Sequence, residues 1–415
     1  MRDKYDMGLA AAFHSPNMSF SVASGYTDGG LGLGHKTRPA QPDDLYVWGS
    51  TTKMITAPAV LQLFERGLVK LTDPISLHID PILLHLNGTR LESHFGTAIH
   101  AVQIQHLLHM TSGIQDYDGG AFSAAQFANR SKAFGPVEIV TRFVSPTLQF
   151  SPGEHQAYCS TNYILLGLVL ATHYHRAGSD WSWQDYDQAS VVPAALQKAF
   201  NHSLFVMQGP CSKYTPVHGF MGFYPSAQLP KQDVWDVSCL GGWTAGNYVG
   251  SVADIARFTY ELYNTKEPKI ISAKSQAHLT NFTAPGMSSF KFYGMGTFNL
   301  DWSVGADAYG HVGDTYGYQS QTTYIPGFDF VISVATNVET EKQAQPADFT
   351  CHAYHQLKAV LTGTRAPHCT FVATRPIFVK VFTCSRLGRE LFKFCHGFWG
   401  LGAGSLTLYE LLQNS

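Results

Sequence analysis

Strand-like segments lie near both ends of this chain, and helical patterns fill the stretch between them. At the start, residues 8–14 and 19–26 flank the turn Ser15–Asn17, a pattern typical of two antiparallel strands. Four strand-like segments follow near the other end: residues 293–298, 308–313, 318–325 and 328–336, the last two joined at Ile325–Phe328. This order predicts an α+β fold in which one antiparallel sheet, built from both chain ends, receives a helical insertion.

The helical patterns begin just after Ser50. From Met54 to Val69 apolar residues recur at helical spacing, although Pro58 lies inside the pattern and is expected to bend the helix. Further helices are predicted over Tyr163–His173, Ser251–Tyr263 and residues 347–361. The region 76–240 as a whole is predicted to be mostly helical, with long irregular loops.

The composition indicates a packed protein with no attraction for nucleic acid. Hydrophobic residues make up 45% of the chain, and charged residues only 14% against an average of about 25%. Lys plus Arg number 28 and Asp plus Glu 30, so there is no basic surplus to bind a phosphate backbone. The strongest apolar run, Ile164–Ala171, is far shorter than the roughly 18 residues of a membrane span. We therefore expect neither a nucleic-acid partner nor a clear membrane span.

Five N-glycosylation sequons stand out, because the chain has only eleven asparagines. Chance would give roughly one or two matches to this pattern. The excess favours passage through a secretory pathway, the alternative being ordinary loop asparagines in a cytosolic protein. The sequons begin at Asn17, Asn87, Asn129, Asn201 and Asn281.

The cysteines and histidines do not form a recognisable metal motif. Seven cysteines are too few for a disulfide scaffold at this length, although Cys211 and Cys239 flank one loop and are candidates to pair. No CxxC or HExxH spacing occurs, and His106 with His109 at i,i+3 is more typical of packing or capping than of a metal site. No metal or organic cofactor is implied. The first residues lack the apolar stretch of a signal peptide and run almost directly into a strand, which is consistent with a missing upstream segment.

The sequence Ser50-Thr-Thr-Lys53 carries the chemistry that most suggests a function. A serine at a helix start gains from free N–H groups and the positive end of the helix dipole. A lysine three residues later lies on the same face, and if desolvated it can take the serine proton near neutral pH. Taken alone, the pattern favours a helix-capping serine beside a solvated lysine, and it is the turn before Ser50 and the apolar helix after it that favour a nucleophile. Ser288-Ser-Phe-Lys291 also matches, but no helical pattern follows it.

Five segments together resemble the class C β-lactamase-related serine hydrolases, penicillin-recognising proteins that include D-aminopeptidases, family VIII esterases and mitochondrial β-lactamase-like proteins. The segment Ser50–Ile75 resembles the nucleophile helix of this family. Four further segments resemble the family motifs in the same order: His106–Ile114, Ser151–Gly167, Ala245–Phe258 and Gly310–Tyr318. The resemblance covers about residues 8–362 and implies a β-lactamase/transpeptidase-like fold with an acyl-enzyme mechanism.

The resemblance assigns roles position by position. Ser50 matches the acylated nucleophile and Lys53 its base. Tyr158 matches a tyrosine that shuttles a proton between nucleophile and leaving group, and a neighbouring lysine is expected to lower its pKa. His311 matches the histidine that replaces lysine in the K-T-G strand motif, and is expected to polarise the site or hold Tyr158. Without the resemblance, Tyr158 would be interpreted as a core aromatic and His311 as a structural residue.

Three more positions concern substrate binding. Gly313 is expected to let substrate lie against the strand edge, and the N–H groups of Ser50 and Asp314 to form an oxyanion hole. The family's asparagine in the Y-x-N motif falls at Ser160, and Asn162 should point elsewhere. A serine hydroxyl is shorter than an asparagine amide, so the change weakens the expectation of β-lactam or peptide substrates.

We expect a catalytic domain over residues 1–363, with a sheet lobe of about 1–75 and 241–363 and a helical lobe of about 76–240. Its expected function is a serine hydrolase acting on a small ester, amide or peptide. The alternative is a catalytically weak or inactive scaffold or interaction protein that keeps the fold. Residues 364–415 are interpreted as a poorly ordered appendage or wrongly predicted gene end, or else as a membrane or partner anchor around Phe394–Tyr409.

Overall fold

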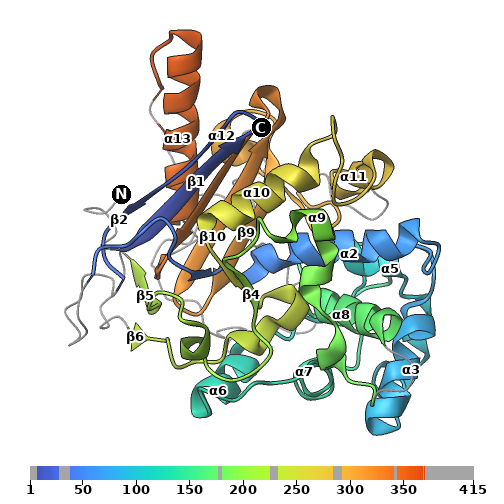
Figure 1. The fold of residues 1–415 in the computed structure, drawn as a ribbon. Helices are drawn as coiled ribbons and strands as arrows, with labels where there is room; N and C mark the ends of the chain where they lie inside the picture. The colour runs from blue at the N-terminus through green and yellow to red at the C-terminus, as the bar shows by residue number, and fades with distance from the viewer. Residues whose placement is uncertain are drawn as a thin grey trace, which may run out of the picture.

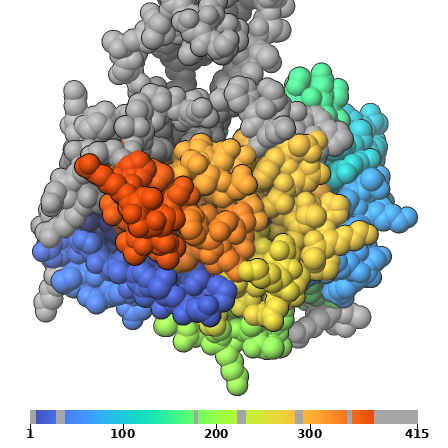
Figure 2. Space-filling view, turned by 90° about the horizontal axis from the view of Figure 1, so that it is seen from above, coloured from blue at the N-terminus to red at the C-terminus, as the bar shows by residue number. Residues whose placement is uncertain are grey.

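The strands predicted at the two chain ends form one six-stranded antiparallel sheet, in the order β2-β1-β11-β10-β9-β8. The computed structural model describes residues 7–27, 38–175, 180–224, 232–283, 292–340, 344–367 and 369. The strands of this sheet are β1 (Leu9–Ser15), β2 (Met18–Ser24), β8 (Phe298–Asn299), β9 (Tyr309–Thr315), β10 (Tyr318–Ile325) and β11 (Phe330–Thr336). Because β1 pairs with β11, residues from the two ends lie side by side, as the neighbouring blue and orange segments show (Figures 1 and 2).

Helices cover both faces of this sheet. Every residue of β10 and β11 is buried, which requires cover on each side. Adjacent residues of a strand point to opposite faces. Phe13 meets Phe349 of α13 (Ala344–Thr362), while His14 meets Tyr260 of α10 (Val252–Tyr263), so these two helices lie on opposite faces of the sheet (Figure 1).

The middle of the chain is mostly helical, as predicted. The buried helix α8 (Ser160–Tyr174) packs against α2 (Lys53–Glu65), α3 (Ile75–Asn87), α5 (Ile104–Leu108) and α7 (Pro136–Phe143). The remaining helices are α4 (Leu91–Phe95), α6 (Gly120–Ala128), α9 (Ala194–Gln197), α11 (Ala273–Leu279) and α12 (Asp301–Val304). Short 3-10 turns lie between them: η1 (Gly49–Thr52), η2 (Thr97–Ala101), η3 (Trp183–Asp185), η4 (Gln188–Val191), η5 (Cys211–Tyr214), η6 (Cys239–Ala245) and η7 (Pro326–Phe328).

Two small sheets tie distant segments together. In one, β7 (Tyr248–Gly250) pairs with β3 (Tyr46–Val47) and β4 (Ser203–Phe205); the other joins β12 (Val338–Thr340), β5 (Phe220–Tyr224) and β6 (Gln232–Asp233). The β3–β7 pairing sets the segment just before Ser50 beside the segment just after Ala245. Cys211 and Cys239 form a disulfide at the start of η6, as their flanking positions suggested.

Two predicted elements differ from the structure. Only the end of the strand expected over 293–298 is a strand, because the chain turns at Gly294 and Gly296: Gly294 N–H bonds to the Thr297 carbonyl, and Gly296 has φ +64°. The helix expected to reach Val69 ends at Glu65, since Gly67 adopts a left-handed conformation with φ +69°. Pro58 lies inside α2, which continues through it.

Some predictions fall outside the described residues. They are those on residues 1–6, on Ser288–Lys291, and on the tail 364–415 apart from 364–367 and Cys369. Cys369 forms a disulfide with Cys351 of α13. Within the described ranges, no helix combines the length and the apolar character needed to cross a membrane.

Candidate active site

Ser50 lies in the turn η1, directly before α2, and is partly exposed to solvent. The turn is fixed from several sides: Trp48 Nε1 donates to the Gly250 carbonyl at 2.9 Å, and Thr52 Oγ1 donates to the Gly49 carbonyl at 2.7 Å. Gly49 has φ +51°, and a Cβ there would lie 2.6 Å from the Asp314 carbonyl oxygen. Glycine is therefore required before Ser50, and the serine is held on a rigid turn against β9.

Lys53 is fully buried beneath this turn. Its Nζ lies 2.9 Å from Ser50 Oγ and 3.0 Å from the carbonyl oxygen of Ala245, and 4.9 Å from the centre of the Tyr158 ring. Burial lowers the Lys53 pKa from 10.5 to about 8, although the Asp116 and Asp118 carboxylates oppose this shift. A lysine with this pKa carries a useful fraction of neutral amine near pH 7, next to a serine hydroxyl.

Tyr158 completes a group of three side chains from separate segments. The nearby Ser50 side chain favours ionisation of its phenol, and its ring stacks on Phe298 with centroids 5.6 Å apart. The expectation that Lys53 lowers the Tyr158 pKa is wrong: burial raises it well above 10, and Asp116 adds to the increase. Tyr158 therefore stays a neutral phenol that can accept one proton while giving up another.

His311 lies behind Tyr158, and the contacts that orient it come from residues other than that tyrosine. Its Nδ1 lies 2.5 Å from the Val312 carbonyl oxygen and its Nε2 lies 3.0 Å from the Tyr293 hydroxyl. Burial and the Lys53 charge hold the His311 pKa well below 6.5, so the ring is neutral. A carbonyl only accepts, so Nδ1 carries the proton and Nε2 accepts from Tyr293. The rings of His311 and Tyr158 are 6.5 Å apart.

Gly313 and Asp314 lie on the edge of β9 that faces Ser50. In an antiparallel strand, alternate residues direct their N–H and C=O groups to the same side. The Ala308 carbonyl accepts from Leu300 N–H on the side of β8, so the Asp314 N–H points to that same side. β8 covers only the first part of this edge of β9. Further along the strand η1 lies against the edge, and the Gly49 backbone contacts the backbone of Asp314. The N–H of Asp314 is thus directed toward the nucleophile turn.

Ser160 is the first residue of α8 and is buried. Its N–H donates to the carboxylate of Asp116, as does the N–H of Asp118, at 3.2 Å. Asn162 points elsewhere, as expected: Ser112 Oγ donates to its Oδ1 at 2.7 Å. Burial and the neighbouring Asp118 carboxylate raise the Asp116 pKa to about 6.

Sequence reasoning missed four contributors to this site. Ala245 contributes only a backbone carbonyl, which no side-chain pattern reveals. Tyr293 and Phe298 border the Gly294–Thr297 turn that was predicted as a strand, so their packing on His311 and Tyr158 was not foreseen. Asp116 follows the matched segment His106–Ile114 by two residues, and this proximity was the one available signal for it.

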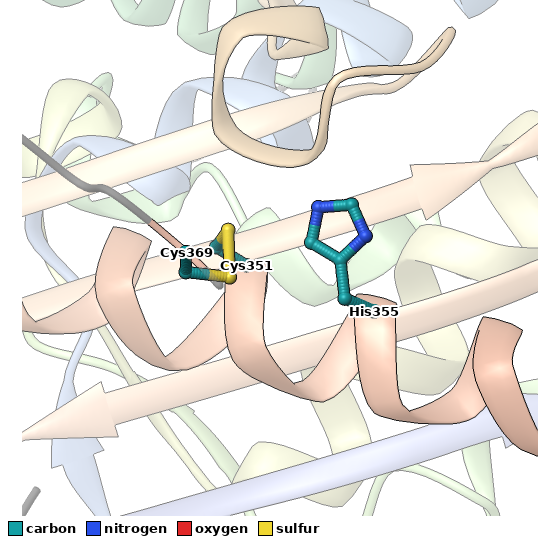
Figure 3. A group of neighbouring side chains, drawn as sticks. All are labelled: Cys351, His355 and Cys369. Carbon is teal, nitrogen blue, oxygen red and sulfur yellow. A yellow bond between two sulfur atoms is a disulfide. The ribbon is translucent and has the colours of Figure 1, made fainter. Parts of the chain in front are cut away.

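Several histidines and cysteines outside this site were candidates for metal binding. Among the described residues, one group could hold a metal ion: Cys351, His355 and Cys369. Figure 3 shows the two sulfur atoms joined in a disulfide, with His355 on the same helix, so in this state neither sulfur is a thiolate ligand. His106 Nδ1 accepts from Gln103 N–H at 3.1 Å, a capping contact at the start of α5.

Two bacterial proteins are similar in sequence to this chain. "Protein flp" of Staphylococcus aureus (strain MW2) is 25% identical over 198 residues, which are 48% of this chain and 35% of that protein. This chain therefore matches about a third of that relative's length. "Penicillin-binding protein 4" of Amycolatopsis lactamdurans is 24% identical over 373 residues, 87% of each chain.

The fold itself is shared with solved structures. A crystal structure of a D-stereospecific amidohydrolase from Streptomyces sp. superposes with a TM-score of 0.62 at 19% identity, covering 86% of this chain and 94% of the other. The family model described as Beta-lactamase matches residues 21–354. The fold is therefore β-lactamase/transpeptidase-like, and this chain belongs to the Beta-lactamase family.

Proposed function

We propose that this protein is a serine hydrolase that forms an acyl-enzyme on Ser50, with Lys53 as the base and Tyr158 as the proton relay. The observation that carries the proposal is the contact of 2.9 Å between Ser50 Oγ and Lys53 Nζ. That contact joins a solvent-reachable hydroxyl to a buried amine whose pKa is lowered to about 8. A surface lysine capping a helix would have neither the burial nor the lowered pKa.

Acylation begins with removal of the Ser50 proton. In the neutral amine of Lys53, one N–H remains on the Ala245 carbonyl while the nitrogen lone pair faces the serine hydroxyl. The alkoxide then attacks the substrate carbonyl carbon, and the tetrahedral oxyanion forms next to the N–H groups of Ser50 and Asp314. Both donors belong to backbone fixed by the contact between η1 and β9, so they need little reorganisation.

Breakdown of the intermediate needs a proton on the leaving group. Tyr158, a neutral phenol near the Ser50 side chain, can give its proton to the leaving atom and recover one from Lys53. Water then repeats the sequence on the acyl-enzyme, with the same base. The neutral His311 adds no second positive charge beside Lys53, which favours the free amine form of that lysine.

A small ester, amide or peptide is the substrate class we propose. The name of the Streptomyces protein, an amidohydrolase, supports an amide carbonyl as a target. Ser160, at the position of the family's asparagine, lacks the amide that would pair with a substrate amide, and this favours esters over β-lactams. Parallel assays with nitrophenyl esters, D-amino-acid amides and a chromogenic cephalosporin test this order, and we expect the esters to be hydrolysed fastest.

The test of the proposal itself is covalent labelling by a fluorophosphonate probe. We expect the wild-type chain to be labelled and Ser50→Ala to remain unlabelled. Ser288→Ala is the matched control, because Ser288 has the same spacing to a lysine, and it should be labelled like the wild type. Absence of labelling in the folded wild type, together with no turnover of any ester, would favour the non-catalytic scaffold instead.

Tyr293 is expected to act as a positioning residue for His311 and, through it, for Tyr158. Tyr293→Phe removes only the hydroxyl that donates to His311 Nε2, so we expect kcat to fall about tenfold, the equivalent of one hydrogen bond, with KM nearly unchanged. Steady-state kinetics on a nitrophenyl ester measure this. Tyr309→Phe, on the neighbouring strand β9, is the control and should keep its kcat. An unaltered kcat in Tyr293→Phe would show that this hydrogen bond does not support the site.

A further inference from the structure

The sequon asparagines differ from the other asparagines in their exposure. All of them are exposed: Asn17, Asn87, Asn129, Asn201 and Asn281. Among the described residues, the asparagines outside sequons are buried or half-buried: Asn162, Asn247, Asn264, Asn299 and Asn337. The polarity of asparagine does not explain this difference in exposure, because four of the five described asparagines outside sequons are buried: Asn162, Asn247, Asn264 and Asn337.

The hydrogen bonds of the amide nitrogens also differ between the sequon asparagines and the others. Outside the sequons, Asn247 Nδ2 donates to Gln188 and to the Val206 carbonyl, and Asn337 Nδ2 donates to the carbonyls of Tyr26 and Thr27. Within the described part of the chain, no sequon asparagine uses Nδ2 in a hydrogen bond. The sequon nitrogens are therefore exposed and available, while the others hold the fold together.

Two sequons also place their hydroxyl on the asparagine side chain. Thr89 Oγ1 donates to Asn87 Oδ1 at 2.6 Å, and Thr283 Oγ1 donates to Asn281 Oδ1 at 2.9 Å. In both, the amide oxygen is occupied and the nitrogen is directed away from that bond. These sites lie at the end of α3 and just after α11, and both asparagines are exposed.

The cysteines supply an independent observation about compartment. Two disulfides are present in the described residues, Cys211–Cys239 and Cys351–Cys369, the second of which joins residue 369 to α13 (Figure 3). Disulfides persist in oxidising compartments and are rare where thiols are kept reduced. The compartments that form such bonds are also those in which asparagine sequons receive sugars.

We propose that this chain is N-glycosylated at these five asparagines and folds with its two disulfides in an oxidising compartment. In the sugar transfer, the asparagine Nδ2 loses one proton and bonds to the anomeric carbon of an oligosaccharide, and a polyprenyl pyrophosphate leaves. Each disulfide forms when two thiols lose two protons and two electrons to the disulfide of an oxidoreductase, which becomes a dithiol. None of the five sites lies in a segment that contributes a candidate active-site residue, so the glycans leave the nucleophile accessible.

Peptide mass spectrometry on the full chain purified from its own cells tests the proposal. Release with an N-glycosidase in ¹⁸O-water converts each glycosylated asparagine to labelled aspartate, and blocking free thiols before reduction identifies paired cysteines. We expect labelled aspartate at the sequons only, none at Asn247 or Asn337, and both cysteine pairs protected. Unmodified sequon asparagines together with four free thiols would overturn the proposal.

Two threonine variants distinguish the effect of the sequon from that of a neighbouring residue. In cells that glycosylate the wild-type chain, Thr283→Ala should lose one glycan from the intact mass, because it removes the sequon of Asn281. Thr280→Ala changes the residue directly before Asn281 and should keep every glycan. Loss of the same glycan in both variants, or in neither, would contradict recognition of the sequon at this site. Ester hydrolysis is expected to be unchanged in both, so this test is independent of the proposed function.

Discussion

Replacing Lys53 with methionine is expected to lower kcat/KM by roughly 10³-fold, the usual size of the loss of a general base. Methionine keeps the length and the apolar stem, so it fills the buried space, but it cannot take the Ser50 proton. The matched control is Lys70→Met, which changes an exposed lysine between α2 and α3 and should leave kcat/KM unaltered. Initial rates on a nitrophenyl ester measure both variants. Full activity in Lys53→Met would remove the proposed base.

The pH dependence of kcat/KM is a second test of Lys53 as the base. Only the neutral amine is a base, so kcat/KM of the wild type should rise with pH and level off above about 8, the pKa of Lys53. Because His311 stays neutral above pH 6, its titration should cause no change in kcat/KM in that range. The residual rate of Lys53→Met should lack the inflection near pH 8. A wild-type profile that is flat between pH 6 and 9 would contradict this assignment.

Stability should also rise with pH, but at higher pH than the rise in activity. Folding lowers the Lys53 pKa from 10.5 to about 8, so between these values the unfolded chain binds more protons. The free energy of unfolding of the wild type should therefore rise with pH across this window, by up to about 3 kcal/mol from this residue. Below about pH 8 Lys53 is protonated in both the folded and the unfolded chain, so its contribution to the free energy of unfolding no longer changes with pH. Denaturant unfolding of the wild type and of Lys53→Met at several pH values isolates the contribution of Lys53. The contributions of the other titrating groups cancel when the two free energies of unfolding are subtracted.

Much of the site could be predicted because its chemistry is local in sequence. Ser50 and Lys53 are one helical turn apart, and the periodicity after Met54 placed that turn at a helix start. Tyr158, His311 and Asp314 entered through the resemblance to the family and not through residue pattern. The Tyr158 pKa was predicted in the wrong direction, because burial of the ring in the folded protein outweighs the nearby lysine, and burial is not visible in the sequence.

The remaining contributors depend on contacts between segments far apart in the chain. The Ala245 carbonyl reaches Lys53 because β3 and β7 pair across about two hundred residues, and any residue type could supply that carbonyl. Tyr293 and Phe298 were assigned to one strand over residues 293–298, whereas two glycines fold that stretch into a turn. That the strands of both chain ends form one sheet was predicted from their positions, but the turn at Gly294–Thr297 was not.

Gly313→Ala should be strongly damaging although it adds only one methyl group. A Cβ at this position would lie 1.9 Å from the Trp48 carbonyl oxygen and 2.3 Å from Ser320 Oγ. The first of these is backbone next to the nucleophile turn, so η1 and β9 must separate. We expect a loss of roughly 3 kcal/mol in the free energy of unfolding. Gly327→Ala, at a glycine with open space around it, should change stability little and is the control.

The effect of Gly313→Ala on catalysis should exceed its effect on folding. Separation of η1 from β9 moves the Asp314 N–H away from the Ser50 N–H, and loss of one oxyanion donor lowers kcat by about 10²–10³-fold. Dividing kcat by the folded fraction from circular dichroism distinguishes this from simple unfolding, and fluorophosphonate labelling should slow in parallel. A variant that is destabilised yet turns over ester at the wild-type rate per folded molecule would show that the β9 edge does not hold the oxyanion. In that case the second donor must come from another segment, and the proposed hydrolase would rest on Ser50, Lys53 and Tyr158 alone.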